Sequence, residues 1–291
     1  MTQYYQIADF VFAVKLKHEC AMGVLLPSFS LFRHMGVSDD NLLFELFEDE
    51  LQQNRPDAEF LEEDRNDLGH TRLYRIGGGY RVELRYADAD KPHVIETDAE
   101  FKRVSAFLRW DDAYVSTALS SMLRIVFAQA ILKHSAVSLH ASAVVSEGKA
   151  YLFMGKSGTG KSTHSRLWLE NVEGAWLLND DNPIVRFADG KAEAFGSPWS
   201  GKTPCYRNEH ASVEAMVRLA QAPFNRFMRK SDVEAFSLLL PGCSVLRYDR
   251  RLHGYLCETL IGMTEAVCVG EMQCLPDADA VRVCRTGIIG N

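Results

Sequence analysis

Positive charge is scarce relative to negative charge in this sequence. Its 291 residues include 32 lysines and arginines against 39 aspartates and glutamates, which gives a formal net charge of -7. A chain with that balance has no general electrostatic attraction to a polyanion. We therefore expect no nucleic-acid partner.

A long uncharged apolar run is also missing. The most apolar stretch, residues 123–139, contains Arg124, Lys133 and His134, whereas a membrane span requires about 20 consecutive apolar residues. The first residues, MTQYYQIADF, show neither the basic segment nor the apolar core of a secretory signal peptide. The sequence thus predicts a soluble, cytoplasmic protein without a membrane partner.

Cysteine pairs of the CxxC type are absent as well. The seven cysteines are odd in number, which argues against a complete disulfide framework and favours reduced thiols. With 47% hydrophobic and 24% charged residues, the composition is that of a globular protein. The length suits two domains, because an ordinary domain has about 100–200 residues.

Strand-like patterns dominate residues 1–110, which we predict to be a β-rich N-terminal domain. Short apolar runs, several of them alternating, occur at residues 4–16, 42–47, 71–76 and 101–110. Each run has the length and pattern of a β-strand. The first half of the chain should therefore be mostly sheet.

Two further segments of this region carry specific signals. Gly77–Gly79 precedes an alternating run over residues 80–86, which predicts a hairpin at the glycines. A nucleotide loop is the alternative there, but no Lys-Ser/Thr pair or helix start follows. Residues 48–67 are strongly acidic, and we predict a surface loop or an exposed helix.

Residues 111–134 are predicted to form a helix that bridges two domains. Asp111 and Asp112 offer an N-cap, and apolar residues recur at helical spacing along one face. Residues 135–291 then form the second domain. Its predicted strands are residues 137–145 and 150–154, and its predicted helices, apart from one after residue 160, lie near residues 213–220, 232–240 and 250–263. The predicted fold class is mixed α/β.

The most informative motif is the segment from Gly155 to Ser162, which fits the phosphate-loop pattern GxxxxGK[ST]. An apolar strand-like run precedes it, and a plausible helix begins at Lys161, as the motif requires. Glycines let successive backbone amides point at phosphate oxygens beside a helix N-terminus. Lys161 should contact the β- and γ-phosphates, and Ser162 should hold Mg²⁺. The alternative is a glycine-rich turn that matches the pattern by chance.

The loop therefore predicts ATP and Mg²⁺ as cofactors. The nucleotide-binding residues predicted from the motif are Gly155, Ser157, Gly158, Thr159, Gly160, Lys161, Ser162 and Thr163.

Two adjacent carboxylates follow the predicted loop helix. A short apolar run ends in Asn179, Asp180 and Asp181. One carboxylate beside a phosphate loop can hold Mg²⁺, and a second can act as a base. The alternative is a turn, because Asn and Asp are also common turn residues.

His140 lies upstream of the loop, within the predicted strand at residues 137–145. It could approach the carboxylates if the neighbouring strands pair, and it would then assist proton transfer. The alternative is a structural histidine.

Together these segments resemble the catalytic domain of HPr kinase/phosphorylase and the broader phosphoenolpyruvate-carboxykinase-like group of P-loop proteins. The resemblance rests on Leu139–Ala141, on Gly155–Thr163 and on Asn179–Asp181, within roughly residues 135–200. By position it implies a P-loop kinase-like catalytic domain in which His140 and Asp180 activate a hydroxyl acceptor. It also implies that Asp181 lies near the metal. From the chemistry of phosphoryl transfer, Lys161 and the loop amides are expected to neutralise the charge that develops on the transferred group, which makes Lys161 a candidate catalytic residue.

Later segments, Phe195–Lys202 and Cys274–Asp277, look like those of uncharacterised bacterial relatives of this kinase. The chain shows no glycine-rich signature of a protein-substrate region, and its N-terminal half looks unrelated to HPr kinase. The resemblance thus leaves the acceptor open. Lys202 and Arg207 are candidate cations for an acceptor or phosphate, with solvated surface charge as the alternative for Arg207.

The sequence favours an ATP- and Mg²⁺-dependent kinase that moves the γ-phosphoryl group to a hydroxyl of a small molecule or peptide. One alternative is a catalytically silent nucleotide-binding regulatory or scaffold protein. A carboxykinase-like enzyme is a weaker candidate, because such enzymes are generally larger and add arginine-bearing segments. A homo-oligomer is compatible with the sequence.

Overall fold

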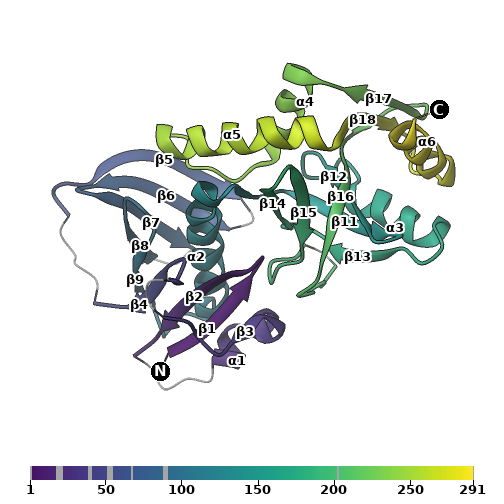
Figure 1. The fold of residues 1–291 in the computed structure, drawn as a ribbon. Helices are drawn as coiled ribbons and strands as arrows, with labels where there is room; N and C mark the ends of the chain where they lie inside the picture. The colour runs from purple at the N-terminus through teal and green to yellow at the C-terminus, as the bar shows by residue number, and fades with distance from the viewer. Residues whose placement is uncertain are drawn as a thin grey trace. The chain divides into compact units, whose positions relative to one another are not determined.

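The chain folds into two compact units, Met1–Ile131 and Leu132–Asn291. A computed structural model describes residues 2–17, 22–38, 41–50, 55–66, 68–87, 91–201 and 203–290. Figure 1 shows both units, and each is described by itself. The fold class is mixed α/β, with a large sheet in each unit.

The first unit is built on a nine-stranded sheet in the order β3-β1-β2-β4-β9-β8-β7-β6-β5. Neighbours are antiparallel except that β4 runs parallel to both β2 and β9. The described elements are β1 (Thr2–Ile7), β2 (Phe10–Lys15), α1 (Met22–Leu25), η1 (Pro27–Phe32), β3 (Arg33–His34), β4 (Glu45–Glu48), β5 (Glu59–Asn66), β6 (Gly69–Ile76), β7 (Gly79–Arg85), β8 (His93–Asp98), β9 (Arg103–Phe107) and α2 (Val115–Ala130).

Helix α2 belongs to this unit and buries one face in its core. Leu119, Met122 and Val126 are fully buried, as the helical spacing predicted. Phe127 on the same helix meets Phe12 of β2 edge to face, with ring centroids 5.8 Å apart. The helix is therefore held by the sheet that it covers.

Two predictions for this unit need correction, and one is confirmed. The run at residues 4–16 is two strands, because Ala8 and Asp9 adopt positive φ and turn the chain. The acidic region is loop or turn at residues 49–50 and 55–58, as predicted, but residues 59–66 form an exposed strand, β5, whose carboxylates pair across the ladder with cations of β6 such as Arg75. Residues 51–54 and 67 of that region lie outside the described residues. The hairpin at Gly77–Gly79 is confirmed.

The second unit contains a sheet in the order β10-β14-β15-β16-β12-β11-β13, with β18 between β16 and β17. Among the described pairs of neighbouring strands in this sheet, two are parallel, β12 with β16 and β16 with β18, and the others are antiparallel. The described elements are η3 (Leu132–His134), β10 (Ala136–Ser138), β11 (Ala141–Ser146), β12 (Lys149–Met154), α3 (Lys161–Asn171), β13 (Trp176–Asn179), β14 (Ile184–Ala188), β15 (Lys191–Phe195), β16 (His210–Gln221), β17 (Arg226–Lys230), α4 (Asp232–Leu239), η4 (Leu240–Gly242), α5 (Arg250–Ala266), β18 (Cys268–Cys274) and α6 (Ala278–Ile289).

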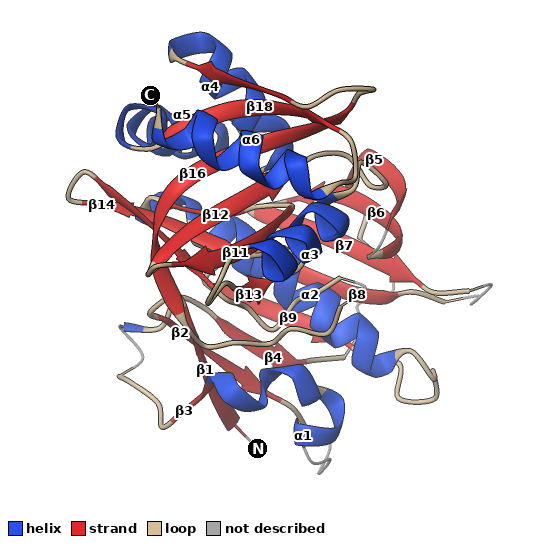
Figure 2. Cartoon of the chain, turned by 90° about the vertical axis from the view of Figure 1, so that its right-hand side faces the viewer, coloured by secondary structure: helices blue, strands red, loops and turns tan. Residues whose placement is uncertain are grey.

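Helices α3 and α6 pack against this sheet and against each other (Figure 2). Their core includes Phe153 of β12, Trp168 of α3 and Cys284 of α6, all fully buried. The Trp168 indole N–H donates to Nε2 of His164 at 3.1 Å. Burial lowers the pKa of His164 to about 4, so this imidazole is neutral at pH 7 and adds no charge to the core.

The helix predicted at residues 213–220 is wrong. This segment is the central strand β16, bonded to β12, β15 and β18. Its alanine, glutamate, methionine and leucine favour a helix locally, but neighbouring strands satisfy its backbone and bury alternate side chains. The predicted helices near residues 232–240 and 250–263 are confirmed as α4 and α5.

Among the described residues, no helix has the length and apolarity that crossing a membrane would require.

The first prediction concerns His93 of β8, whose side chain is completely buried. Its Nδ1 accepts the backbone N–H of Arg109 at 3.2 Å, so the neutral ring carries its proton on Nε2, 3.2 Å from Asp112 Oδ2. Burial lowers the pKa of His93 below the usual 6.5, and Asp112 offsets this only in part. The folded chain therefore binds fewer protons than the unfolded chain once the pH falls below about 6.5.

We expect the stability that depends on neutral His93 to be present above about pH 6.5 and lost as the pH falls towards the lowered pKa. His93→Gln should melt at a lower temperature than the native chain at pH 7.5, with a smaller difference at pH 5. Melting curves of both proteins across this range measure the effect. Parallel pH profiles would contradict the assignment.

Candidate phosphate-binding site

The predicted phosphate loop connects β12 to α3. Gly155 and Gly160 have φ values of 154° and 100°, which side-chain-bearing residues rarely adopt. A Cβ on Gly155 would also collide with the hydroxyl of Thr159. Both the backbone N–H and the hydroxyl of Thr159 donate to the carbonyl of Lys156, at 3.1 and 2.8 Å. The loop is thus a tight turn that delivers the chain into the first turn of α3.

Lys161, the first residue of α3, turns its ammonium back towards the loop. Its Nζ donates to the carbonyl of Gly155 at 3.0 Å and lies 2.7 Å from Nε2 of His140. Burial lowers the pKa of Lys161, and the nearby Asp181 and Asp180 carboxylates partly offset that effect. The ammonium of Lys161 is therefore held beside Gly155, where the loop begins.

His140 lies in a break between two strands rather than inside one. The predicted strand at residues 137–145 is divided into β10 and β11, and the His140 N–H donates to the carbonyl of Gly242 at 2.8 Å. The ring lies between Lys161 and Asp181, whose Oδ1 is 3.3 Å from His140 Nδ1. Because an ammonium only donates, Nε2 must accept, and Nδ1 carries the proton that faces Asp181. The three side chains form one polar chain.

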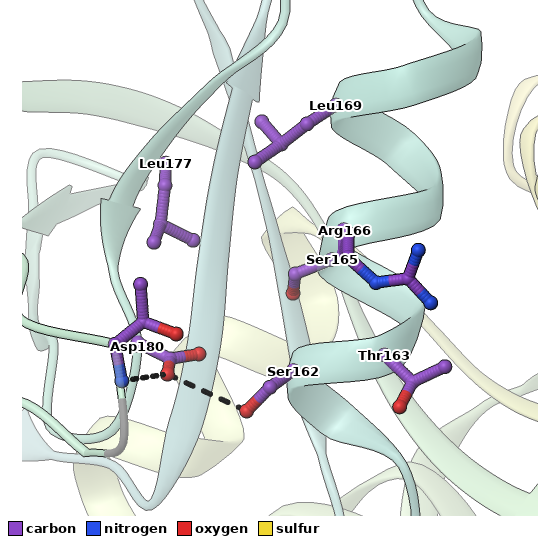
Figure 3. Close-up of a pocket in the computed structure, with 8 residues that line it drawn as sticks. Ser162, Thr163, Ser165, Arg166, Leu169, Leu177 and Asp180 are labelled. Atoms are coloured by element: carbon purple, nitrogen blue, oxygen red, sulfur yellow. Dashed lines mark hydrogen bonds between the residues drawn. The ribbon is translucent and has the colours of Figure 1, made fainter.

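Asp180 lies at the end of β13 and is only 4% exposed. Its Oδ1 accepts from the Ser142 hydroxyl at 3.1 Å, and its Oδ2 accepts from the Ser162 hydroxyl at 3.4 Å and the Thr203 N–H at 3.2 Å. Figure 3 shows Ser162 reaching from the first turn of α3 towards this carboxylate. Asp180 is therefore fixed from three directions.

The pair Ser162 and Asp180 suits Mg²⁺. Both offer hard oxygen donors, and Mg²⁺ at nucleotide sites takes few protein ligands and completes its shell with water and phosphate. In the part of the chain that the structure describes, no three His, Cys, Asp or Glu side chains form a metal cluster. These two oxygen donors fit a magnesium ion that would also bind nucleotide phosphates and water, rather than a metal site built wholly of protein ligands.

The fully buried side chain of Asn179 holds the acidic turn in place. Its Oδ1 accepts the backbone N–H groups of Asp181 and Asn182, at 3.0 and 2.7 Å. Its Nδ2 donates to the carbonyls of Trp199 and Ser197, at 3.0 and 3.3 Å. One amide therefore ties the carboxylate pair to the segment that follows β15.

The structure brings the predicted residues together with a specific pairing. Asp180 contacts Ser162, and Asp181 contacts His140, which in turn contacts Lys161. Gly155, Ser157, Gly158, Thr159 and Gly160 form the loop, and Thr163 follows Ser162 on α3. The guanidinium of exposed Arg207 lies 5.2 Å from the ring centroid of Trp176. Lys202 lies outside the described residues.

Ser142 and Ser165 belong to no motif in the sequence, and the motifs predict no role for Asn179 or Ser197 themselves. The Ser165 hydroxyl of α3 donates to Ser142 at 2.7 Å, so α3, β11 and Asp180 are linked. Their only signal in the sequence was a small polar residue at a position where the strand or helix pattern required burial.

A prediction about stability follows from the contacts of Asn179. Asn179→Ala leaves buried backbone groups at both ends of the amide without partners, and each costs about 1–3 kcal/mol. We expect the unfolding free energy to fall by roughly 2–4 kcal/mol, measured by chemical denaturation. Asn171→Ala is the matched control, because exposed Asn171 makes a single side-chain bond, to the carbonyl of Leu167. Equal losses in the two variants would contradict the role of Asn179.

Comparisons with known proteins give no family for this chain. No family model matches the sequence, and no curated protein matches it. Among solved structures, the HPr(Ser) kinase/phosphatase from Coxiella burnetii aligns with 53% of this chain and 99% of its own, at 13% identity and a TM-score of 0.30. A likeness at this identity and TM-score shows no family and assigns no role to any residue.

Proposed function

We propose that the protein is an ATP- and Mg²⁺-dependent phosphotransferase that moves the γ-phosphoryl group to a hydroxyl of a small molecule or peptide. The observation that carries the proposal is the meeting of three predicted elements at the first turn of α3. The glycine loop, the carboxylate pair and His140 come from separate segments of the chain. Lys161, where the loop ends, contacts His140, and the next residue, Ser162, contacts Asp180. Phosphoryl transfer needs such a grouping of cation, metal ligands and base.

The loop and helix supply the anion site. The loop leads directly into α3, whose first backbone N–H groups have no partner within the helix. These donors and the helix dipole favour a phosphate at this end. Lys161 would exchange its bonds to Gly155 and His140 for oxygens of the β- and γ-phosphates.

Ser162 and Asp180 would hold the magnesium ion. When bound, the ion neutralises the negative charge that develops on the transferred group. Ser142 and Thr203 keep the Asp180 carboxylate directed at Ser162 before any metal arrives. Little reorganisation is then required on binding.

Asp181 would accept the proton of the attacking hydroxyl, with His140 orienting it. The Nδ1 proton of His140 faces one oxygen of this carboxylate. In this proposal the two aspartates exchange the roles that the family resemblance implied, because Asp180 is the carboxylate beside Ser162. The proton acceptor and the metal ligand remain adjacent in sequence.

The acceptor would enter through a cleft of about 300 Å³ on the Asp180 side of α3 (Figure 3). Asp180, Ser162 and Arg166 give it polar walls, and Leu169 and Leu177 form its apolar part. This volume admits a small molecule or one side chain of a peptide. Both acceptor classes therefore stay in the proposal.

The test is a transfer screen with γ-labelled ATP and Mg²⁺ against free amino acids, sugars, other small alcohols and hydroxyl-bearing peptides. We expect label on at least one acceptor class, and none with Lys161→Ala, which should also lose its ATP-induced rise in melting temperature. The variant must keep the circular dichroism spectrum of the native chain. ATP binding that needs Lys161 but gives no labelled acceptor would favour the silent regulatory alternative.

A second experiment separates the two carboxylates. Asp180→Asn should raise the Mg²⁺ concentration needed for half-maximal transfer, because one metal ligand loses its charge. Asp181→Asn should retain the native Mg²⁺ requirement and lose about 10²-fold or more in kcat, because the proton acceptor is gone. Steady-state kinetics across a Mg²⁺ series measure both effects. The reverse pattern would restore the roles implied by the resemblance.

A further inference from the structure

Two buried serines lead from α3 to the carboxylate of Asp180. Every residue of β11 is buried, and Ser142 in this strand is 0% exposed. Ser165, one turn along α3 from Ser162 (Figure 3), is 2% exposed. A buried hydroxyl is costly unless it is hydrogen-bonded, whereas an alanine at either position would carry no such cost. What these hydroxyls bind to therefore indicates what they do.

The two hydroxyls form a relay that ends on one oxygen of Asp180. Ser165 Oγ donates to Ser142 Oγ at 2.7 Å, and Ser142 Oγ donates to Asp180 Oδ1 at 3.1 Å. Because an ionised carboxylate only accepts, the single proton of Ser142 is committed to Asp180, and Ser142 must accept from Ser165. Ser165 donates to this relay, although a serine inside a helix can bond to a carbonyl of its own helix instead.

The relay holds the two oxygens of Asp180 on different partners. Oδ1 is bonded to Ser142 inside the sheet, whereas Oδ2 accepts from the Ser162 hydroxyl at 3.4 Å and from the Thr203 N–H at 3.2 Å. Helix α3 thus acts on both oxygens, on Oδ2 directly through Ser162 and on Oδ1 through Ser165 and Ser142. Oδ2 is the oxygen on the side of Ser162, the other expected metal ligand.

We propose that Ser142 and Ser165 restrict Asp180 to a single metal-binding oxygen and thereby favour Mg²⁺ over Ca²⁺, an inference that rests on the proposed function. Ca²⁺ takes about 6–8 oxygen ligands and readily binds both oxygens of one carboxylate, whereas Mg²⁺ is smaller, takes few protein oxygens and keeps several waters. With Oδ1 held by Ser142, Asp180 offers Oδ2 alone. This arrangement suits Mg²⁺ and leaves Ca²⁺ short of an oxygen.

Neither serine would touch the ion, so both are positioning residues. Ser142 acts on Oδ1 directly, and Ser165 acts only through Ser142, whose hydroxyl it orients. Two residues that act in series give effects that do not add. Two serines that merely tied α3 to β11 would change the stability of the fold and leave the preference between the two ions unchanged.

The test needs no turnover. The β,γ-imido analogue of ATP is titrated calorimetrically into the protein in excess Mg²⁺ and, separately, in excess Ca²⁺, and the readout is the Kd with Ca²⁺ divided by the Kd with Mg²⁺. We expect Ser142→Ala, which frees Oδ1, to lower this ratio about tenfold, since partners of metal ligands typically shift metal affinity by about 10- to 100-fold. Ser165→Ala should lower it less, and the double variant should match Ser142→Ala.

Thr259→Val is the matched control. Thr259 on α5 belongs to the same unit and is 3% exposed, and its hydroxyl donates to the carbonyl of Tyr255 at 2.8 Å. The substitution removes one buried hydroxyl and keeps the volume of the side chain. It should lower the melting temperature and leave the ratio of the two Kd values native. If Ser142→Ala failed to fold, Ser142→Cys would replace it, because a thiol is a weak donor.

A native ratio in both single variants, each with the native circular dichroism spectrum, would overturn the inference and leave the proposed function intact. A native chain that bound the analogue equally well with the two ions would also overturn it. A further drop on adding Ser165→Ala to Ser142→Ala would contradict the relay. If the native chain bound the analogue with neither ion, the proposed function would fail, and this inference with it.

Discussion

The amide of Asn179 is the contact on which the candidate site depends. Its oxygen holds the backbone of Asp181 and Asn182, while its nitrogen holds the segment at Ser197–Trp199. That segment leads on to Thr203, whose N–H bonds to Asp180. Two adjacent aspartates repel each other, and a turn without such support would let them separate into solvent. Here the backbone geometry, together with the hydrogen bonds of the Asp180 carboxylate, keeps the pair beside α3.

The contacts that run from Asp181 through His140 to Lys161 show how the lysine of the loop is held. Lys161 is buried, and a buried ammonium is costly unless it has acceptors. The carbonyl of Gly155 and Nε2 of His140 provide them, and Asp181 fixes the His140 tautomer that allows Nε2 to accept. A histidine from the break between β10 and β11 thus orders the lysine of the loop, some twenty residues away in sequence.

The sequence predicted the parts of the site that depend on local chemistry. The glycines, Lys161 and Ser162 were found because a phosphate loop needs those residue types at fixed spacing. The pairing of Asp180 with Ser162 and of Asp181 with His140 depends on the strand register of β11 and β13, which residue types do not encode.

In the fold, too, the elements set by local sequence were predictable and those set by tertiary pairing were not. Hairpin glycines and helix α2 were predictable, but β16 was not, because tertiary pairing overrides the helix propensity of its residues.

The periodicity of α3 places two clefts, of about 300 and 400 Å³, on different sides of this helix. Residues 162, 165, 166 and 169 line the cleft with Asp180, residues 160, 164 and 167 line the other, and Thr163 lines both. The two clefts therefore share Thr163, in the first turn of the helix. That turn carries Lys161 and Ser162, the groups expected to contact the transferred phosphate. In the proposed reaction, one side of this helix would face the acceptor, and the first turn would bring the acceptor to the phosphoryl group.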